Sequence, residues 1–408
     1  MKRVFVCFIL IICILLSSFI ACGRRDNPTN GLVYEMIEGK NEYALKSNSN
    51  TAQENITIAS TYNGLPVTKI DGLAFYNDTN MASVYIPETI TSINTGAFMG
   101  CVNLKSISIP KNVNYIADTA FLNCSNLKEI TVNKDNQFYT SIDGNLYNKD
   151  GSSLIRYASG KRDERFMIPI SVKKIEVNAI NDSDYLKEIE MSNCITSIGD
   201  GALFGCDALK NITIPHSVKS IGRNAFASCN RLEQIFVEES NLNYISIDGN
   251  LYNKRKTHLI QYCIKKNNEK FEVPQSVEKV ETYAFVGASS LKTIIFSNNV
   301  LEIGSFEDCE NLVGLKIPNT ITVIASGQFR NCKKLEYLIV PKSITFIAPE
   351  AFYGCDKLKL YVESSQDDNA PWELNYPNIS VYYYSETSSN QIGQYWHYDS
   401  NGEIEIWS

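Results

Sequence analysis

Histidine is scarce in this chain, which contains only His216, His258 and His397 in 408 residues. Zinc sites are built from closely spaced cysteine and histidine ligands, yet no C-x-x-C or H-E-x-x-H string occurs. No serine or cysteine has a histidine placed by the sequence to act as its base, and no phosphate-binding loop is found. We therefore predict no metal site, no cofactor and no catalytic residue, and expect a protein that is not an enzyme.

An excess of basic residues is also lacking. Lysine and arginine total 38 against 45 aspartate and glutamate residues, so the formal net charge is −7. Binding to nucleic acid depends on a basic surface that neutralises phosphates. The charge balance therefore argues against nucleic acid as a partner.

Long apolar runs are absent except near the N-terminus. Two basic residues precede an apolar run over residues 4–16, which is the pattern of an export signal. This run is shorter than the roughly 20 residues that a spanning helix needs. The string FIAC at 19–22 resembles a bacterial lipobox. That resemblance implies a lipoprotein signal peptide at 1–21, lipid on Cys22, membrane anchoring outside the cytoplasm, and a polar tether at 22–30. An ordinary secretory signal or an uncleaved anchor are the alternatives.

The chain does contain a repeat of 23 residues. Residues 101–123 read CVNLKSISIPKNVNYIADTAFLN, and the pattern restarts at Cys124 and again at Cys206. A fixed period in this range predicts a solenoid whose stacked units share one core. The alternation in I-x-I predicts a short strand with both aliphatic side chains inward. The proline that follows in most copies ends that strand.

The recurring string C-x-x-L-x-x-I-x-I-P-x-x-V-x-x-I-G-x-x-A-F resembles the BspA-type leucine-rich repeat of bacterial surface proteins, over about residues 55–365. This resemblance implies a mainly β repeat solenoid, a leucine-rich-repeat superhelix with short parallel strands. It also implies a surface-exposed protein that binds extracellular or cell-surface proteins or glycans in adhesion.

The period divides the chain. We expect an N-terminal cap at 31–77, the solenoid at 78–362 and an aromatic C-terminal cap at 363–408. The tail strings VYYYSET and YWHY resemble those of relatives. Its aromatic side chains either seal the last turn or bind sugars or partners by stacking.

Two insertions interrupt the period, near 136–162 and 241–267. Both contain the string SIDGNLYNK, 105 residues apart, which indicates a duplicated unit. Asp-Gly at the centre suits a two-residue hairpin turn. We predict two small β-meanders that project from the solenoid.

Seven cysteines occupy one repeat position: Cys101, Cys124, Cys206, Cys229, Cys309, Cys332 and Cys355. Two interpretations remain open. They are small buried residues at a tight corner, or neighbours such as Cys101 and Cys124 form disulfides, because adjacent turns lie within the Cα range for a bridge.

The middle residue of each I-x-I should point outward and, if the strands line the concave side, form a row suited to binding. The row comprises Tyr85, Ser108, Thr131, Met167, Glu190, Thr213, Phe236, Glu272, Ile295, Lys316, Ile339 and Tyr361. Strand propensity alone would also select many of these residue types. We predict ligand binding by this row on the concave face. An envelope enzyme or enzyme subunit acting on glycans, or a structural spacer, is the alternative. Paired carboxylates about 5–10 Å apart beside aromatic rings would favour the enzyme.

Overall fold

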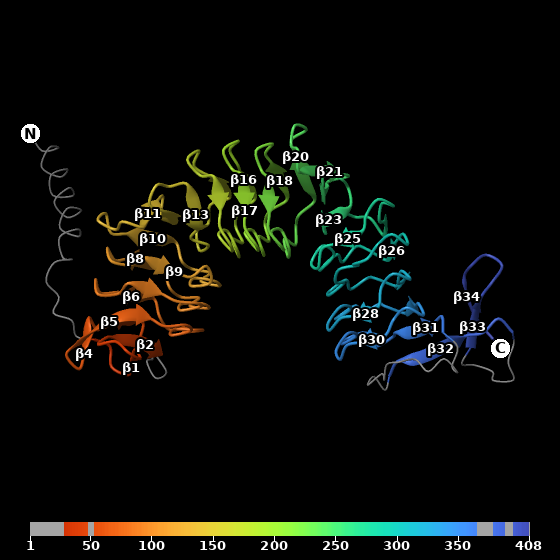
Figure 1. Cartoon of the computed structure of the whole chain (residues 1–408), viewed down its shortest axis with the longest axis horizontal. Helices are drawn as coiled ribbons and strands as arrows, with labels where there is room; N and C mark the ends of the chain where they lie inside the picture. The colour runs from red at the N-terminus through yellow and green to blue at the C-terminus, as the bar shows by residue number, and fades with distance from the viewer. Residues whose placement is uncertain (1–27, 48–52, 365–377, 388–394, 408) are drawn as a thin grey trace, which may run out of the picture.

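The computed structural model of the chain describes residues 28–47, 53–364, 378–387 and 395–407. Every element assigned within these residues is a β-strand, from β1 to β34, and the turns stack into an arch (Figure 1). The fold class predicted from the repeat, a leucine-rich-repeat solenoid, is confirmed. Within the described ranges, no helix is long and apolar enough to cross a membrane. Cys22, the leader and most of the tether lie outside the described residues.

One strand per turn comes from the I-x-I segment. Neighbouring strands pair in parallel at the repeat spacing, as where Ile130 lies opposite Ile107. The first and third side chains of the segment point into the core, and Ile107 and Ile109 are both buried. These long strands are β6 (Ser83–Tyr85), β8 (Ser106–Ile109), β10 (Glu129–Val132), β14 (Arg165–Met167), β16 (Glu188–Glu190), β18 (Asn211–Ile214), β20 (Gln234–Val237), β24 (Lys270–Glu272), β26 (Thr293–Ile295), β27 (Gly314–Lys316), β29 (Tyr337–Val340) and β31 (Lys359–Val362).

A second strand of two residues closes most turns, and its second residue is buried at nearly every turn. These short strands are β7 (Ser92–Ile93), β9 (Tyr115–Ile116), β15 (Lys174–Ile175), β17 (Ser197–Ile198), β19 (Ser220–Ile221), β25 (Lys279–Val280), β28 (Val323–Ile324) and β30 (Phe346–Ile347). The core lies between the long and short strands. Within the core, the phenylalanines of the repeated Ala-Phe pair stack from turn to turn. The ring centroids of Phe75 and Phe98 are 5.1 Å apart.

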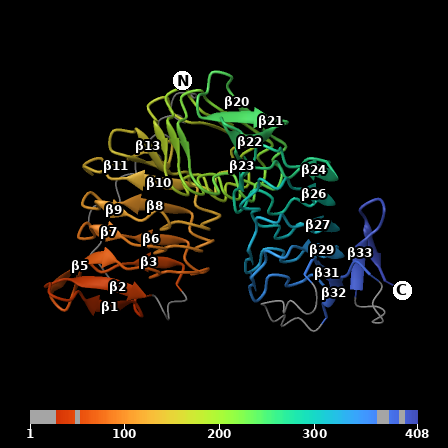
Figure 2. The ribbon, with the colours of Figure 1, turned by 45° about the vertical axis from the view of Figure 1, so that its right-hand side comes forward.

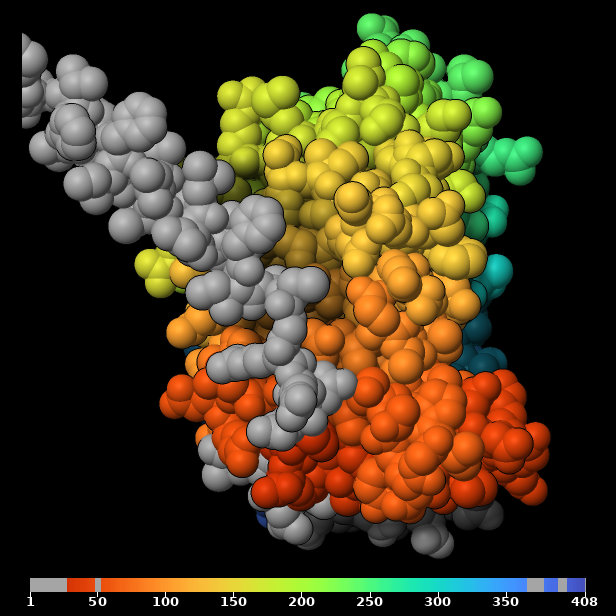
Figure 3. All heavy atoms as spheres, turned by 90° about the vertical axis from the view of Figure 1, so that its left-hand side faces the viewer, coloured from red at the N-terminus to blue at the C-terminus, as the bar shows by residue number. Residues whose placement is uncertain are grey.

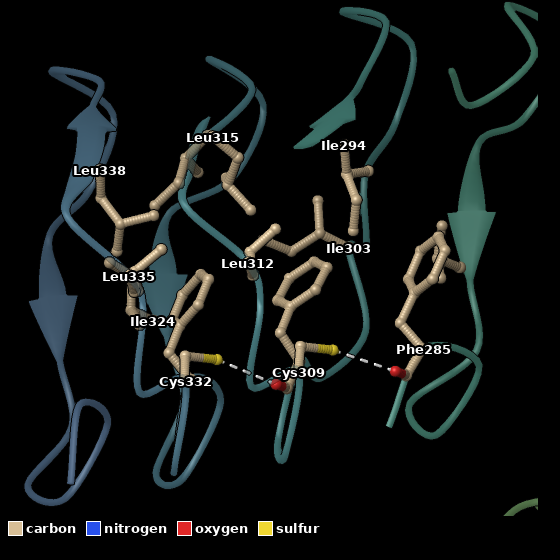
Figure 4. Close-up of a cluster of buried hydrophobic side chains, with 14 of the residues drawn as sticks. Phe285, Ile294, Ile303, Cys309, Leu312, Leu315, Ile324, Cys332, Leu335 and Leu338 are labelled. Atoms are coloured by element: carbon tan, nitrogen blue, oxygen red, sulfur yellow. Dashed lines mark hydrogen bonds between the residues drawn. The ribbon is translucent and has the colours of Figure 1, made fainter. Parts of the chain in front are cut away.

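The seven cysteines that share one repeat position, called the ladder cysteines below, form hydrogen bonds. Figure 4 shows these bonds for Cys309 and Cys332. Each thiol donates to a backbone carbonyl of the preceding turn, with Sγ–O distances of 2.9–3.3 Å. Since a buried carbonyl without a donor is costly, cysteine at this corner both fills a small space and pairs a backbone group. All nine cysteines within the described residues are free thiols, which favours the buried-residue interpretation over disulfides.

The two inserts are three-stranded meanders, as predicted. The first contains β11 (Tyr139–Ile142), β12 (Asn145–Asn148) and β13 (Ser153–Arg156), and the second β21 (Tyr244–Ile247), β22 (Asn250–Asn253) and β23 (His258–Gln261). The expectation that they project is wrong for β12 and β13. Leu146, Tyr147 and Leu154 are fully buried, and β13 pairs in parallel with β15. The third strand therefore replaces a short strand of the solenoid, because its apolar side chains complete the core.

The core divides at the inserts into three hydrophobic clusters. The first runs from Tyr43 to Ala158, the second from Tyr147 to Cys263 and the third from Tyr252 to Val362. Each boundary falls where an insert contributes side chains to the clusters on both sides.

Both ends of the stack carry additional strands. At the N-terminal end these are β1 (Val33–Met36), β2 (Tyr43–Ser47), β3 (Asn55–Thr57), β4 (Thr61–Tyr62) and β5 (Leu65–Ile70). Figure 3 shows these residues in red and orange at the base of a continuous wall of turns. At the C-terminal end, β32 (Ser380–Tyr384), β33 (Tyr395–Tyr398) and β34 (Ile404–Ile406) extend the sheet that begins at β24.

Candidate functional site

The predicted row, called the outward row below, faces solvent along most of the array. Ten of its twelve side chains, from Tyr85 to Lys316, are exposed or half-buried. Its apolar members are well exposed: Met167 is 65%, Phe236 48% and Ile295 43% accessible. Polar members of the row, among them Glu190 and Glu272, separate these apolar side chains, so they form no contiguous apolar patch.

The row does not follow the concave side throughout. Figures 1 and 2 both place the sheet containing β26 and β31 on the outer side of the C-terminal arm, and Figure 1 places β28 and β30 on its inner side. The concave placement predicted from the sequence is therefore wrong for this arm. Each turn here carries a strand on both sides. The direction in which the solenoid bends follows from the small rotation between turns. The strand pattern in the sequence therefore does not show which side is concave.

Three members of the row, Glu190, Thr213 and Phe236, lie together in the middle of the array. They line a hollow of about 570 Å³ over β16, β18 and β20. β16 and β18 belong to different sheets, so the hollow lies at a break in the row of paired strands. The geometry therefore gathers an aromatic ring, a hydroxyl and a carboxylate at one place.

Charged side chains of both signs surround this hollow. Lys187 and Lys210 line it, and Arg165 contacts both Glu188 and Glu190. These ion pairs are solvent-exposed, so they contribute little to stability. Exposed charges around a binding surface instead favour orientation and specificity in binding.

The C-terminal end of the row differs from the prediction. Ile339 and Tyr361 are only 8% and 6% accessible, so the expectation that they face solvent is wrong. Both belong to a cluster with Trp396, which is fully buried. The Trp396 ring lies edge-on to Tyr361, with centroids 5.7 Å apart, and its Nε1 donates to the Val362 carbonyl at 3.1 Å. The tail thus folds over the row and covers it.

Polar contacts fix the tail in this position. Glu363 Oε1 accepts hydrogen bonds from Lys316 Nζ at 2.7 Å and from the Tyr398 hydroxyl at 2.8 Å. Burial opposes the charge on Lys316, but its hydrogen bonds to Glu363 and Tyr398 hold its pKa above the ordinary value. A second hollow of about 440 Å³ lies beside these groups, lined also by Tyr384 and Lys342.

The described lining of this second hollow can be compared with a glycosidase site. Among the described residues that line it, Glu363 is the single carboxylate, whereas glycoside hydrolysis uses two. The prediction that the tail seals the last turn is supported by its burial of Ile339 and Tyr361, while the rings of Tyr384 and Tyr398 remain at the hollow's edge.

His216, His397 and Cys309 each have a structural contact or a buried position. His216 Nδ1 lies 2.7 Å from Glu238 Oε2 at the surface, and His397 stacks on Trp407 at 3.7 Å. Burial raises the pKa of the Cys309 thiol to about 12, so it remains protonated. Within the part of the chain that the structure describes, no group of three or more His, Cys, Asp or Glu could hold a metal ion.

Comparisons with known proteins agree with this architecture. The family model described as "BspA type Leucine rich repeat region" matches residues 43–155, 157–257 and 257–368, with 6 copies. No curated protein sequence matches the chain.

Solved structures similar in fold include the following two. A leucine-rich cell surface protein from Faecalibacterium prausnitzii is 24% identical, with 88% of this chain and 95% of that chain covered and a TM-score of 0.53. The pneumococcal vaccine antigen PcpA is 22% identical, with 88% and 93% covered and a TM-score of 0.51.

Proposed function

Because the chain belongs to the BspA-type leucine-rich-repeat family, we propose that it is a cell-surface protein without enzymatic activity that binds a protein or glycan partner through its outward row. The observation that carries the proposal is Phe236, an exposed aromatic side chain that lines the hollow over β16, β18 and β20. The F. prausnitzii structure, described as a leucine-rich cell surface protein, supports the surface location.

A protein partner fits the central hollow well. Binding hot spots are a few large side chains near the centre of a patch, surrounded by weaker contacts. Phe236 has this position, with Thr213 and Glu190 beside it and paired charges around them. The row is also long enough to engage an extended surface, which is the general use of solenoids.

The test is the Phe236→Ala variant of the exported chain. Loss of this ring should weaken binding by about 1–3 kcal/mol, while the melting temperature stays nearly unchanged because the side chain is exposed. Beads coated with the chain would be measured for adhesion to cultured epithelial cells and to bacterial cells. Phe346→Ala is the matched control, since Phe346 is similarly exposed but lies on the short-strand side in β30.

Equal loss in both variants would show that adhesion is not specific to the row. Unchanged adhesion in Phe236→Ala, with wild-type stability, would move the binding site to the inserts or the aromatic tail. Strong destabilisation would mean that the ring supports the fold.

We also propose that the chain is anchored to the membrane by lipid on Cys22, on the basis of the leader and the string FIAC at 19–22. Cys22→Ser should release the protein from the membrane fraction or leave the leader uncut. Fractionation and the mass of the mature N-terminus measure both outcomes. A Cys22→Ser protein that is cut normally and stays on the membrane contradicts the lipoprotein proposal.

A further inference from the structure

The two inserts fill one equivalent position with different side chains. Arg156 in β13 and Gln261 in β23 are 105 residues apart, the length of the duplicated unit. Arg156 is only 2% accessible. Its Nη2 donates to the carbonyl of Phe121 at 3.0 Å, and its Nη1 donates to the carbonyl of Asn178 at 2.7 Å. One guanidinium group therefore joins the turn before the first insert to the turn after it.

Gln261 does not span the same distance. It is also buried, and its Nε2 donates to the carbonyls of Tyr262 at 2.9 Å and Ala284 at 3.3 Å. The counterpart of Phe121 in the second unit is Phe226, which is buried. No described residue donates a hydrogen bond to the Phe226 carbonyl. A buried carbonyl without a donor is rare and costly.

A hollow of about 200 Å³ lies at this place. Its buried lining residues are Ala225, Phe226, Tyr244 and Gln261, and Arg223, His258 and Glu281 lie at its more accessible edge. It is smaller than the roughly 300–1,000 Å³ typical of pockets for whole small molecules. Its size suits a single planar group that enters from the edge.

The edge of the hollow carries charged side chains of both signs, Arg223 and Glu281. Arg223 lies 3.8 Å from Asp200, and Lys279 is shared between Glu281 and Glu302. Asp200, Lys279 and Glu302 lie outside the lining of the hollow, whose own charged groups are Arg223 and Glu281. A guanidinium group brings several N–H donors in one plane and no acceptor, which matches the unpaired Phe226 carbonyl and the acceptor oxygens of Glu281 at the edge.

We propose that the hollow in the second insert binds a guanidinium group from outside the chain, in the position that Arg156 fills in the first insert. The group comes either from an arginine side chain of a protein partner or from a small guanidinium compound. The same acceptors serve both sources. The site is separate from the outward row, because it lies on the short-strand side of the turns beside β19 and β25.

Binding of methylguanidinium to the full chain tests this proposal, with N-methylurea as the neutral analogue of similar shape. Saturable binding of methylguanidinium, at least about tenfold tighter than that of N-methylurea, is expected from charge-assisted hydrogen bonds. Equal binding of the two compounds, or none by methylguanidinium, would overturn the proposal. Tighter binding of a blocked Gly-Gly-Arg-Gly-Gly peptide would point to a protein partner, and tighter binding of agmatine to a small molecule.

Gln261→Arg should fill the hollow with the chain's own guanidinium and reduce binding about tenfold or more. Gln275→Arg adds the same charge at an exposed position of the same unit and should leave binding unchanged. Glu281→Gln, at the accessible edge, should weaken binding severalfold and serves if Gln261→Arg does not fold. Wild-type affinity in a folded Gln261→Arg protein would refute the site. If Gln261→Arg does not fold, wild-type affinity in Glu281→Gln would refute it.

Discussion

Two stretches of the outward row hold the same position of the repeat but have opposite surroundings. In β16–β20 the row is open, and Phe236 projects into solvent beside a hollow. In β29 and β31 the equivalent residues Ile339 and Tyr361 lie beneath the chain's own tail. Exposure along this row is therefore decided by what covers it rather than by the repeat itself. The tail also shows the chemistry that suits the row: a large aromatic ring packed on it and a polar contact beside it.

Removing the ring that covers the row should have the largest effect. Trp396→Ala deletes a fully buried side chain and its hydrogen bond to Val362, which should cost about 3–5 kcal/mol locally. Hydrogen exchange of residues 337–362 and the melting curve would measure this loss. Exchange at wild-type rates in those strands would mean that the tail does not stabilise the last turns.

A smaller effect should separate the covered and open stretches directly. Ile339→Ala should cost about 2 kcal/mol or more, because the side chain is buried. Ile295→Ala at the equivalent exposed position of β26 should change stability by less than about 0.5 kcal/mol. Chemical denaturation of both variants gives the comparison. Equal losses would place the two residues in the same environment and contradict the difference described above.

The smallest effect is expected from one hydroxyl. Tyr398→Phe removes the donor to Glu363 while keeping the ring, and should cost about 1 kcal/mol. Tyr382→Phe is the control, since its hydroxyl forms no hydrogen bond with a described residue. A greater loss in the control than in Tyr398→Phe would show that the Lys316–Glu363–Tyr398 contact does not hold the tail.

The sequence sufficed for the repeated part of the fold because each turn obeys the same local rule. Ile107 and Ile109 are buried and Ser108 exposed, as alternation requires. Phe236 likewise follows from its position in I-x-I, and its exposure confirms the strand register.

The sequence could not indicate contacts that depend on where distant segments meet. Trp396 lies 35 residues after Tyr361 and outside the period, so no spacing rule places one ring on the other. The aromatic composition of the tail was the available signal, and it indicates stacking without naming a partner. No sequence pattern identified the roles of Arg156 and Gln261 either, because these roles depend on carbonyls from neighbouring turns.

The division of the core into three clusters has a mechanical consequence. Suppose that the chain is held near its N-terminus and that a partner bound near the other end pulls on it. The force then passes through the three clusters one after another. Because units of a solenoid contact only their neighbours, one cluster can open while the others remain folded. Tension would then be relieved by stepwise lengthening, so that a surface protein of this design yields gradually instead of detaching or unfolding at once.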